Sequence, residues 1–274
     1  MGDIALKTDR TIDYRRRRIA IDAVLVSSFS AIYIVFRSLP TYPMLGIPGA
    51  TFKAGDIVAP LFGALLGPLL GPLSITVGTF AAFSTGAPPV FLGLDFLPAA
   101  ASAAMVGLMT RRRKKESILL NGVIILLFLA LPYTAFYIQV GAYSIPFIWL
   151  HLIGLALLIS PLSTKAASKI SIQLPRVTNP RLVDLGRNLG SLFVLSLIAT
   201  LAQHLMGGIL TQAVVGLNFN RVPGRYSTWQ AFWTFVFWVY PVERTATAIA
   251  AALLAAPVIV ALKRSRLTEY FPGS

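Results

Sequence analysis

Long apolar runs separated by short clusters of lysine and arginine constrain the fold of this chain more than any other feature. Runs such as 118–131, 145–160 and 246–262 alternate with basic clusters such as 111–115. A bilayer core is about 30 Å thick, and a helix needs roughly 20 apolar residues to cross it. Because 56% of the 274 residues are hydrophobic and only 12% are charged, we predict an all-α integral membrane helix bundle.

The basic clusters predict how the spans are oriented, because cytoplasmic loops of membrane proteins carry an excess of Lys and Arg. Clusters at 15–18, 111–115 and 263–266 are therefore assigned to the cytoplasm, together with both termini and a loop at 163–187. The same sorting accounts for the formal net charge of +14, so nucleic-acid binding is not expected. The location predicted is the cell (plasma) membrane, crossed several times.

One stretch, 55–83, is apolar but interrupted by Gly-Pro-Leu-Leu-Gly-Pro at 67–72. Proline removes a helical hydrogen bond and clashes with the preceding turn. Only a chain that doubles back here leaves the cluster 111–115 on the cytoplasmic side. We therefore predict two short helices, 55–67 and 72–83. Two thin spans and a re-entrant hairpin would both return the chain to the outer side. A re-entrant hairpin is possible because irregular backbone is tolerated at depth where protein or a wet cavity shields it.

The division of the chain follows from these spans. We predict a basic cytoplasmic N-terminus at 1–18, a single transmembrane helical domain at 19–266 and a cytoplasmic tail at 267–274. Within the domain the expected helices are 19–36, 55–67, 72–83, 94–110, 118–139, 145–162, 188–216 and 242–262, about eight in all.

A tryptophan-rich segment precedes the last of these helices. Pro241 suits the first turn of a helix, so residues 226–240 are expected to form a separate outer helix lying against the headgroups. Their tryptophans fit an interfacial aromatic belt. The alternative is one long helix kinked at Pro241.

Five charged residues are expected at one depth near the outer face: Lys53, Asp56, Asp95, Glu243 and Arg244. Charges inside a membrane bundle are costly, so each is a candidate functional residue. The functional interpretation is a polar pocket beneath the loop 37–53. The structural alternative is capping, with Asp95 as a helix N-cap and Glu243 opposite a helix dipole. Adjacent residues point apart on a helix, so Glu243 and Arg244 are expected to meet the pocket only at its edge.

Two histidines lie within apolar segments. A hydrogen bond across helices is the expectation for each histidine, as for most buried polar groups. His204 is also the stronger candidate of the two for a ligand contact. Asp22 is expected to pair with Arg18 one turn away. Outer residues give +5 (Arg37, Lys53, Arg221, Arg225, Arg244) and −3 (Asp56, Asp95, Glu243), and the difference of +2 points to an anionic or zwitterionic ligand.

Small residues recur every four positions on two of the expected helices. Ala23, Ser27 and Ala31 form one stripe, and Ala99, Ala103 and Gly107 form another. Such stripes let helix backbones approach closely in lipid. Spacing alone does not distinguish packing within the chain from packing against a partner.

Four features in order resemble the substrate-binding (S) component of energy-coupling factor (ECF) vitamin transporters. They are the basic N-terminus with its small-residue helix, a Gly/Pro-rich loop ending in Phe-Lys-Ala-Gly-Asp at 52–56, the Leu-Leu-Gly-Pro-Leu-Leu-Gly-Pro at 65–72, and a closing Ala-rich helix after Tyr-Pro-Val-Glu-Arg at 240–244. The resemblance covers roughly 15–115 and 188–266. It implies a six-helix core, to which the hairpin 117–162 would be an addition.

The resemblance further implies a high-affinity membrane subunit for uptake of a vitamin or cofactor precursor. Its partners would be one membrane coupling subunit and two cytosolic ATPases, and its binding residues Lys53, Asp56, Asp95, His204, Glu243 and Arg244. In that family a small-residue stripe on the first helix faces the coupling subunit, which assigns this role to Ala23, Ser27 and Ala31. The chain has no Gly-Lys pair and so no Walker A loop of its own.

Two other classes of function compete with this interpretation. A membrane-embedded enzyme of lipid or isoprenoid metabolism would need paired carboxylates, metal-spaced histidines or an activated nucleophile. No HExxH or GxSxG motif occurs, and the chain has no cysteine. A secondary transporter often shows an internal repeat, and none is evident. We therefore expect no catalytic residue, metal site or cofactor.

Overall fold

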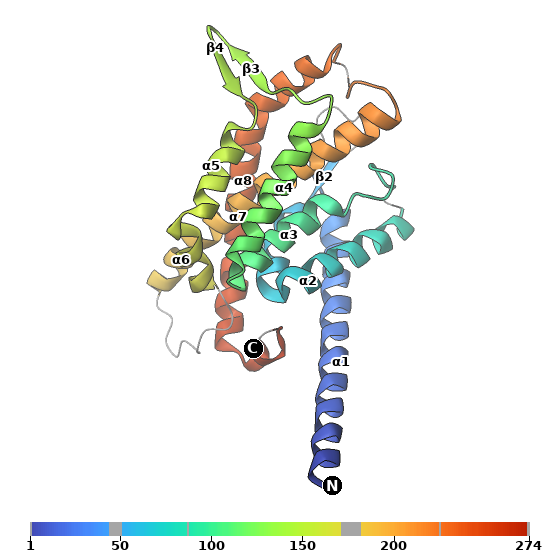
Figure 1. Cartoon of the computed structure of the whole chain (residues 1–274), viewed down its shortest axis with the longest axis vertical. Coiled ribbons are helices and arrows are strands. Elements are labelled where there is room, and N and C mark those ends of the chain that lie inside the picture. The colour runs from blue at the N-terminus through green and yellow to red at the C-terminus, as the bar shows by residue number, and fades with distance from the viewer. Residues whose placement is uncertain (1, 44–50, 87, 171–181, 225, 273–274) are drawn as a thin grey trace.

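The computed structural model describes residues 2–43, 51–86, 88–170, 182–224 and 226–272, with the side chains of 2–14, 42–43, 182–187, 266 and 269 left aside. The elements in chain order are α1 (Gly2–Ser38), β1 (Pro40–Pro43), β2 (Thr51–Lys53), α2 (Gly55–Ser84), α3 (Leu97–Thr110), α4 (Lys114–Ala130), β3 (Tyr137–Val140), β4 (Tyr143–Pro146), α5 (Trp149–Ile159), α6 (Pro161–Ile170), α7 (Leu182–Leu210), a π-helix (Thr211–Asn218), α8 (Trp229–Arg264) and a 3₁₀-helix (Arg266–Tyr270). The predicted all-α bundle is confirmed (Figure 1).

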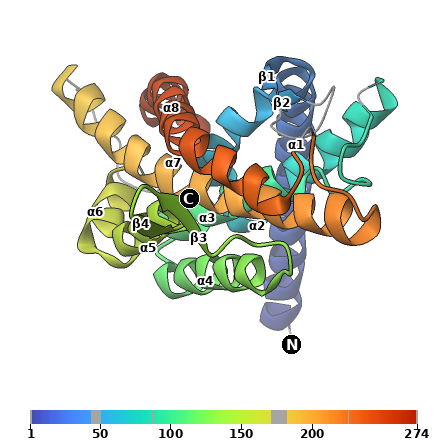
Figure 2. The same ribbon diagram turned by 90° about the horizontal axis from the view of Figure 1, so that it is seen from above.

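Four of the helical segments are long and apolar enough to cross a membrane: Arg15–Ser38, Gly55–Ser84, Asn188–Asn218 and Trp229–Arg264. The pair α5 and α6, bent by 69°, would make a fifth span if it crossed as one unit. The chain is therefore a membrane protein. Seen from above, α4, α5 and α6 lie together on one side of the bundle, away from β1 and β2 (Figure 2).

The helix α2 reverses direction at its centre, as the tandem Gly-Pro pattern predicts. Gly67 has φ +82° and ψ −172°, outside helical values, so the helix on each side of it is separate. An added Cβ on Gly55 would lie 3.0 Å from the Tyr33 ring, and one on Gly78 would lie 3.1 Å from the same residue. Both legs of α2 therefore lie beside one level of α1. Gly55–Ser84 is a helical hairpin and not a single crossing (Figure 1).

Arg111, which directly follows α3, stabilises the break in α2. The Arg111 guanidinium donates to the carbonyl of Leu65 at 3.3 Å, which satisfies an acceptor that the interrupted helix leaves open. Burial, and then the charge of Arg18, lowers the pKa of Arg111. Arg18, the Gly67 break and Arg111 therefore share one end of the bundle.

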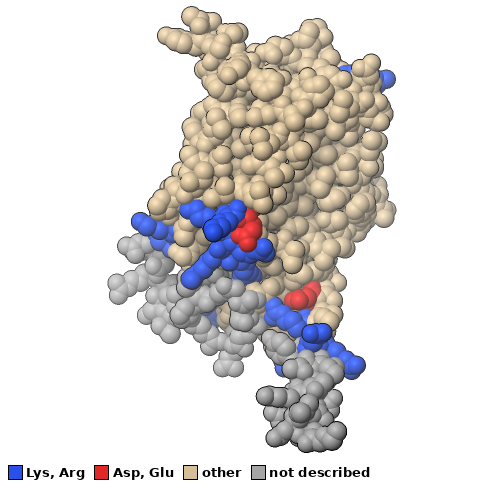
Figure 3. Space-filling view, in the orientation of Figure 1, with Lys and Arg blue, Asp and Glu red and all other residues tan. Residues whose placement is uncertain are grey.

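This end, which we call the basic end, gathers the predicted cytoplasmic clusters (Figure 3). Lys114 donates to the carbonyls of Ile159 and Ser160, and Lys263 donates to the carbonyl of Lys169. The expected pair Arg18–Asp22 forms at 3.4 Å. Arg176, Arg181 and Arg225 lie outside the described residues.

The hairpin 117–162 contains less helix than predicted. The helix expected at 118–139 ends at Ala130, because Leu131 precedes a proline and is extended, with ψ 143°. Alternating residues then form the antiparallel pair β3–β4, which turns at Gly141 with φ +61°. The helix expected at 145–162 begins only at Trp149 and bends into α6 after Ser160. In this hairpin the proline and the alternating strand residues end the helices before the apolar runs end.

The separate outer helix predicted for 226–240 is wrong, and the alternative of one long helix holds. Helix α8 begins at Trp229, where the Thr228 hydroxyl accepts from the Ala231 N–H at 3.1 Å, and it continues through Pro241. Trp233 is only 2% exposed and therefore not interfacial. Its ring lies 5.4 Å from Phe128 and 5.0 Å from Phe147, so core packing holds this part of α8 in the bundle.

Candidate functional site

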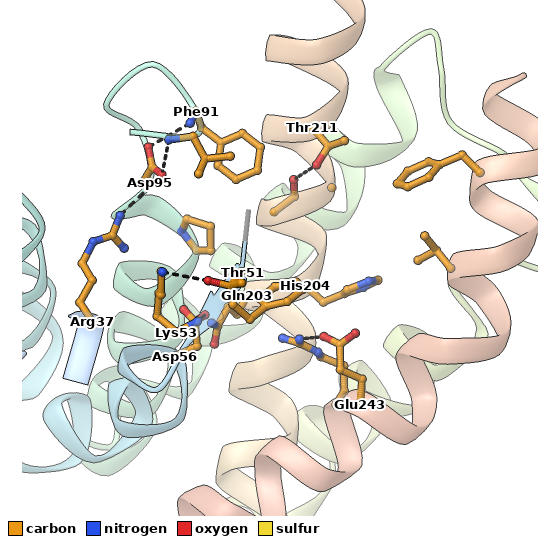
Figure 4. Close-up of a pocket in the computed structure, with 18 of the residues that line it drawn as sticks. Arg37, Thr51, Lys53, Asp56, Phe91, Asp95, Gln203, His204, Thr211 and Glu243 are labelled. Carbon is orange, nitrogen blue, oxygen red and sulfur yellow. Dashed lines mark hydrogen bonds and ion pairs between the residues drawn. The ribbon is translucent and has the colours of Figure 1, made fainter. Parts of the chain in front are cut away.

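A pocket opens between the start of α2, the loop before α3, α7 and the middle of α8 (Figure 4). Its volume is about 200 Å³. All six binding residues proposed from the sequence line it: Lys53, Asp56, Asp95, His204, Glu243 and Arg244. The end of the bundle that holds this pocket, here called the pocket end, lies opposite the basic end, since Arg37 and Arg18 stand on opposite ends of the span 15–38.

Asp95 holds the loop before α3 to the end of α1. Its carboxylate accepts from the backbone N–H of Val90 at 2.8 Å and of Phe91 at 3.0 Å. The same carboxylate pairs with Arg37 at 3.5 Å, and both side chains are nine-tenths or more buried. The expected N-cap role is wrong, because Phe96 occupies that position and α3 has no side-chain cap. Asp95 instead ties the pocket wall together.

Lys53 and Asp56 enter the pocket from the turn between β2 and α2. Asp56 accepts from the Lys53 backbone N–H at 3.3 Å, while the Lys53 ammonium donates to the Thr51 hydroxyl at 2.8 Å. The Gln203 side chain of α7 lies beside the Asp56 carboxyl across the pocket. Strand β2 therefore places Thr51 and Lys53 on one side of the pocket, and α7 places Gln203 on the opposite side.

Glu243 and Arg244 do not point apart as expected. They form an ion pair with each other, with side-chain exposures of 9% and 1%. The Arg244 guanidinium also lies 5.4 Å from the centre of the Phe52 ring, a cation–π contact that links α8 to β2. Since α8 begins at Trp229, Glu243 is not at a helix start and the expected dipole role is wrong. Both residues instead brace the wall that faces β2.

The two predicted histidines touch each other. His151 Nε2 lies 3.1 Å from His204 Nδ1, and both rings stack on Tyr240 at 5.1 and 4.8 Å between centres. The expectation that His151 bonds across helices is confirmed. Of the two, only His204 lines the pocket. In a hydrogen bond between two imidazoles, one of the two facing nitrogens must be an unprotonated acceptor. The contact with His151 therefore fixes the orientation of the His204 ring.

The predicted binding residues did not include the apolar wall of the pocket or four of its polar residues: Arg37, Thr51, Gln203 and Thr211. Phe91, Phe232, Trp233 and Val236 line it, each buried. Three of these come from the segment that was expected to lie at the headgroups. Gln203 had a usable signal, because it is a polar residue beside His204 in an otherwise apolar helix.

The proposed partner-facing stripe is on the surface. Ala23, Ser27 and Ala31 are all exposed on α1. As for metals, no group of three or more His, Asp or Glu that could hold an ion occurs within the described ranges.

Comparison with known proteins gives no family model, curated protein or solved structure that matches this chain. The class that fold and pocket define is therefore a membrane helix bundle with a polar pocket at one end. Any narrower assignment depends on the residues themselves.

Proposed function

We propose that this chain is the binding subunit of a membrane uptake system for a small molecule, a vitamin or cofactor precursor, and that separate coupling and ATPase subunits drive it. In this proposal the chain resembles the S component of an ECF transporter, with a six-helix core to which the hairpin 117–162 is added. The chain itself binds ligand and performs no chemistry.

The observation that carries the proposal is the convergence of polar residues from five parts of the chain on one pocket. The lining residues come from α1 (Arg37), β2 and the start of α2 (Lys53, Asp56), the loop before α3 (Asp95), α7 (Gln203, His204) and α8 (Glu243, Arg244). Buried polar groups at this density are costly in a membrane bundle unless they serve a site. Concave, largely apolar pockets with a few convergent polar groups are typical small-molecule sites.

Two features support the need for partner subunits. The chain has no Gly-Lys pair, so it lacks a Walker A phosphate loop. The stripe Ala23, Ser27 and Ala31 is exposed on α1 and offers a close-approach surface for another helix. We propose that the coupling subunit packs here, and that two cytosolic ATPases act through it.

The orientation belongs to the same proposal. Because positive loops stay inside, the basic end faces the cytoplasm, with both termini, and the pocket faces outward across the cell membrane. A membrane-impermeant reagent should then label a cysteine placed at Lys115 only after the cells are opened. Labelling of intact cells at this position would reverse the orientation and contradict uptake from outside.

Purification of the tagged chain from its native host tests the function directly. The expected result is co-purification of one membrane protein and two ATPases, and release of a stoichiometric small molecule on denaturation, identified by mass spectrometry. Lys53→Gln should lower the bound small molecule at least tenfold, whereas Lys115→Gln, the same change at an exposed residue of the basic end, should not. An isolated chain that turns over a lipid metabolite would favour the membrane enzyme instead.

A further inference from the structure

We propose that the pocket binds a single-ring molecule with no net charge, which donates an N–H or O–H hydrogen bond to Gln203. This inference rests on the proposed function and adds the chemical class of the ligand. Three independent features of the pocket support it: its charge balance, one unsatisfied acceptor, and its size and apolar wall.

The charges that line the pocket cancel. Three lining residues are cationic (Arg37, Lys53, Arg244) and three are anionic (Asp56, Asp95, Glu243), so the described lining sums to 3 − 3 = 0. The excess of +2 expected from the sequence came from outer residues beyond this set, and Arg221 does not line the pocket. Of the expected anionic or zwitterionic ligand, the anionic alternative therefore loses its basis, whereas a zwitterion has no net charge.

These charges are engaged with one another or with the protein. Asp95 pairs with Arg37 and accepts two backbone N–H groups. Glu243 pairs with Arg244. A net charge brought into this balanced, largely buried set would leave the pocket with an uncompensated charge, and burying such a charge is costly. The balance therefore favours a ligand without net charge.

One buried acceptor among the described lining residues still needs a partner, besides one buried donor, the Nε of Arg37. Gln203 is buried, at 3% exposure, and its Oε1 has no hydrogen-bond partner. The carboxylate of Asp56, which lies beside Gln203, only accepts hydrogen bonds, so the amide NH₂ of Gln203 is the group suited to face it and the amide oxygen is left as an acceptor. An unsatisfied buried acceptor costs free energy. A ligand that donates a hydrogen bond here removes that cost.

The remaining surface fits the face of a ring. Phe91, Phe232 and Trp233 line the pocket and are buried. The Trp233 indole N–H already donates to the carbonyl of Tyr133 at 2.7 Å, so this residue offers no donor to a ligand. A cavity of roughly 150 Å³ in a protein core holds benzene. The 200 Å³ here therefore suits one ring with a small substituent.

Three ring compounds of one shape and different charge test the assignment: nicotinamide (uncharged, with an N–H donor), nicotinate (anionic) and 1-methylnicotinamide (cationic). Each is added at millimolar concentration to the full chain in lipid nanodiscs, and thermal unfolding is followed, since a ligand of the folded state raises Tm. For the wild type we expect nicotinamide to stabilise at a concentration at least tenfold lower than the other two.

Matched variants separate the charge balance from general effects. Glu243→Gln makes the lining +1, so nicotinate should gain at least tenfold relative to nicotinamide. Glu116→Gln is the same change at an exposed residue paired with Arg113 at the basic end, and it should alter nothing. Gln203→Leu should weaken nicotinamide at least tenfold, whereas Gln230→Leu, at an exposed glutamine of α8 outside the pocket, should not.

The outcomes distinguish this inference from the proposed function. Wild-type preference for nicotinate or 1-methylnicotinamide, or equal responses of the two glutamate variants, would overturn the charge assignment and leave a binding subunit in place. If none of the three compounds stabilises the chain, the single-ring assignment fails. If the purified chain then also releases no small molecule, the proposed function fails with it.

Discussion

Two stripes of small residues, identical in spacing, have opposite environments in this molecule. Ala99, Ala103 and Gly107 on α3 are buried against α2. An added Cβ on Gly107 would lie 2.5 Å from the Gly67 backbone, and one on Gly63 would lie 2.0 Å from the Ala103 carbonyl oxygen. The stripe on α1, at 23–31, is instead exposed.

The spacing of small residues determines only how closely another backbone can approach the helix. What approaches it depends on the neighbours that the fold supplies. On α3 the neighbour is the hairpin of α2, whose glycines let backbones touch. On α1 the described part of the chain leaves the stripe open, which is why a partner subunit is proposed there and not on α3.

The largest expected effect is from filling the buried stripe. Gly107→Leu places a side chain where even a Cβ would overlap the Gly67 backbone, so the free energy of unfolding should fall by about 3 kcal/mol or more. Thermal unfolding in detergent measures this. Gly122→Leu is the control, because nothing lies within 4 Å of an added Cβ on that α4 glycine. Equal Tm values for the two variants would contradict the packing described.

A smaller loss of unfolding free energy is expected from a change at the reversal in α2, against which the buried stripe packs. Gly67→Ala must adopt φ +82° and lies 3.1 Å from Arg111 Nε, so it should cost about 2 kcal/mol of unfolding free energy. Gly86→Ala also has positive φ but open space around it, and it should cost about 1 kcal/mol. A Gly86 variant as destabilised as the Gly67 variant would remove the role given to Arg111.

Filling the exposed stripe should affect association and not folding. Ser27→Leu should leave the free energy of unfolding within about 0.5 kcal/mol of the wild type. If the proposed coupling subunit packs on this stripe, the same change should weaken its co-purification at least tenfold, about 1.4 kcal/mol. Ala156→Leu, at an exposed small residue of α5, should retain the complex. If Ser27→Leu unfolds the chain, α1 packs within the bundle and the comparison fails.

The smallest effect is expected from the surface pair on α1. Asp22→Asn removes the ion pair with Arg18, whose side chains are 32% and 27% exposed. The free energy of unfolding should fall by only about 0.3–0.5 kcal/mol, since such pairs are screened by solvent. Urea unfolding at low and high salt measures it. A loss of more than about 1 kcal/mol would mean that this end of α1 is not solvent-exposed.

Several features were predictable because they depend on local chemistry. Gly-Pro repeats forced the reversal within 55–84, since proline cannot continue the helical hydrogen bonds. The polar residues of the pocket were predictable because charges are rare in apolar spans. The end of α4 does not follow from apolar length, because the apolar run continues beyond Pro132, and only this proline and the strand alternation at 137–146 signal it.

By itself, the sequence determined that this chain is a membrane bundle, that its basic clusters gather at one end, and that charged residues from separate segments line one pocket. Those are consequences of hydropathy and backbone chemistry that each segment carries alone. Only the tertiary structure decided that α8 runs unbroken through Pro241, that Glu243 pairs with Arg244, and that the pocket charges cancel. The physical reason is that these outcomes depend on packing energies between segments distant in the chain, which no single segment encodes.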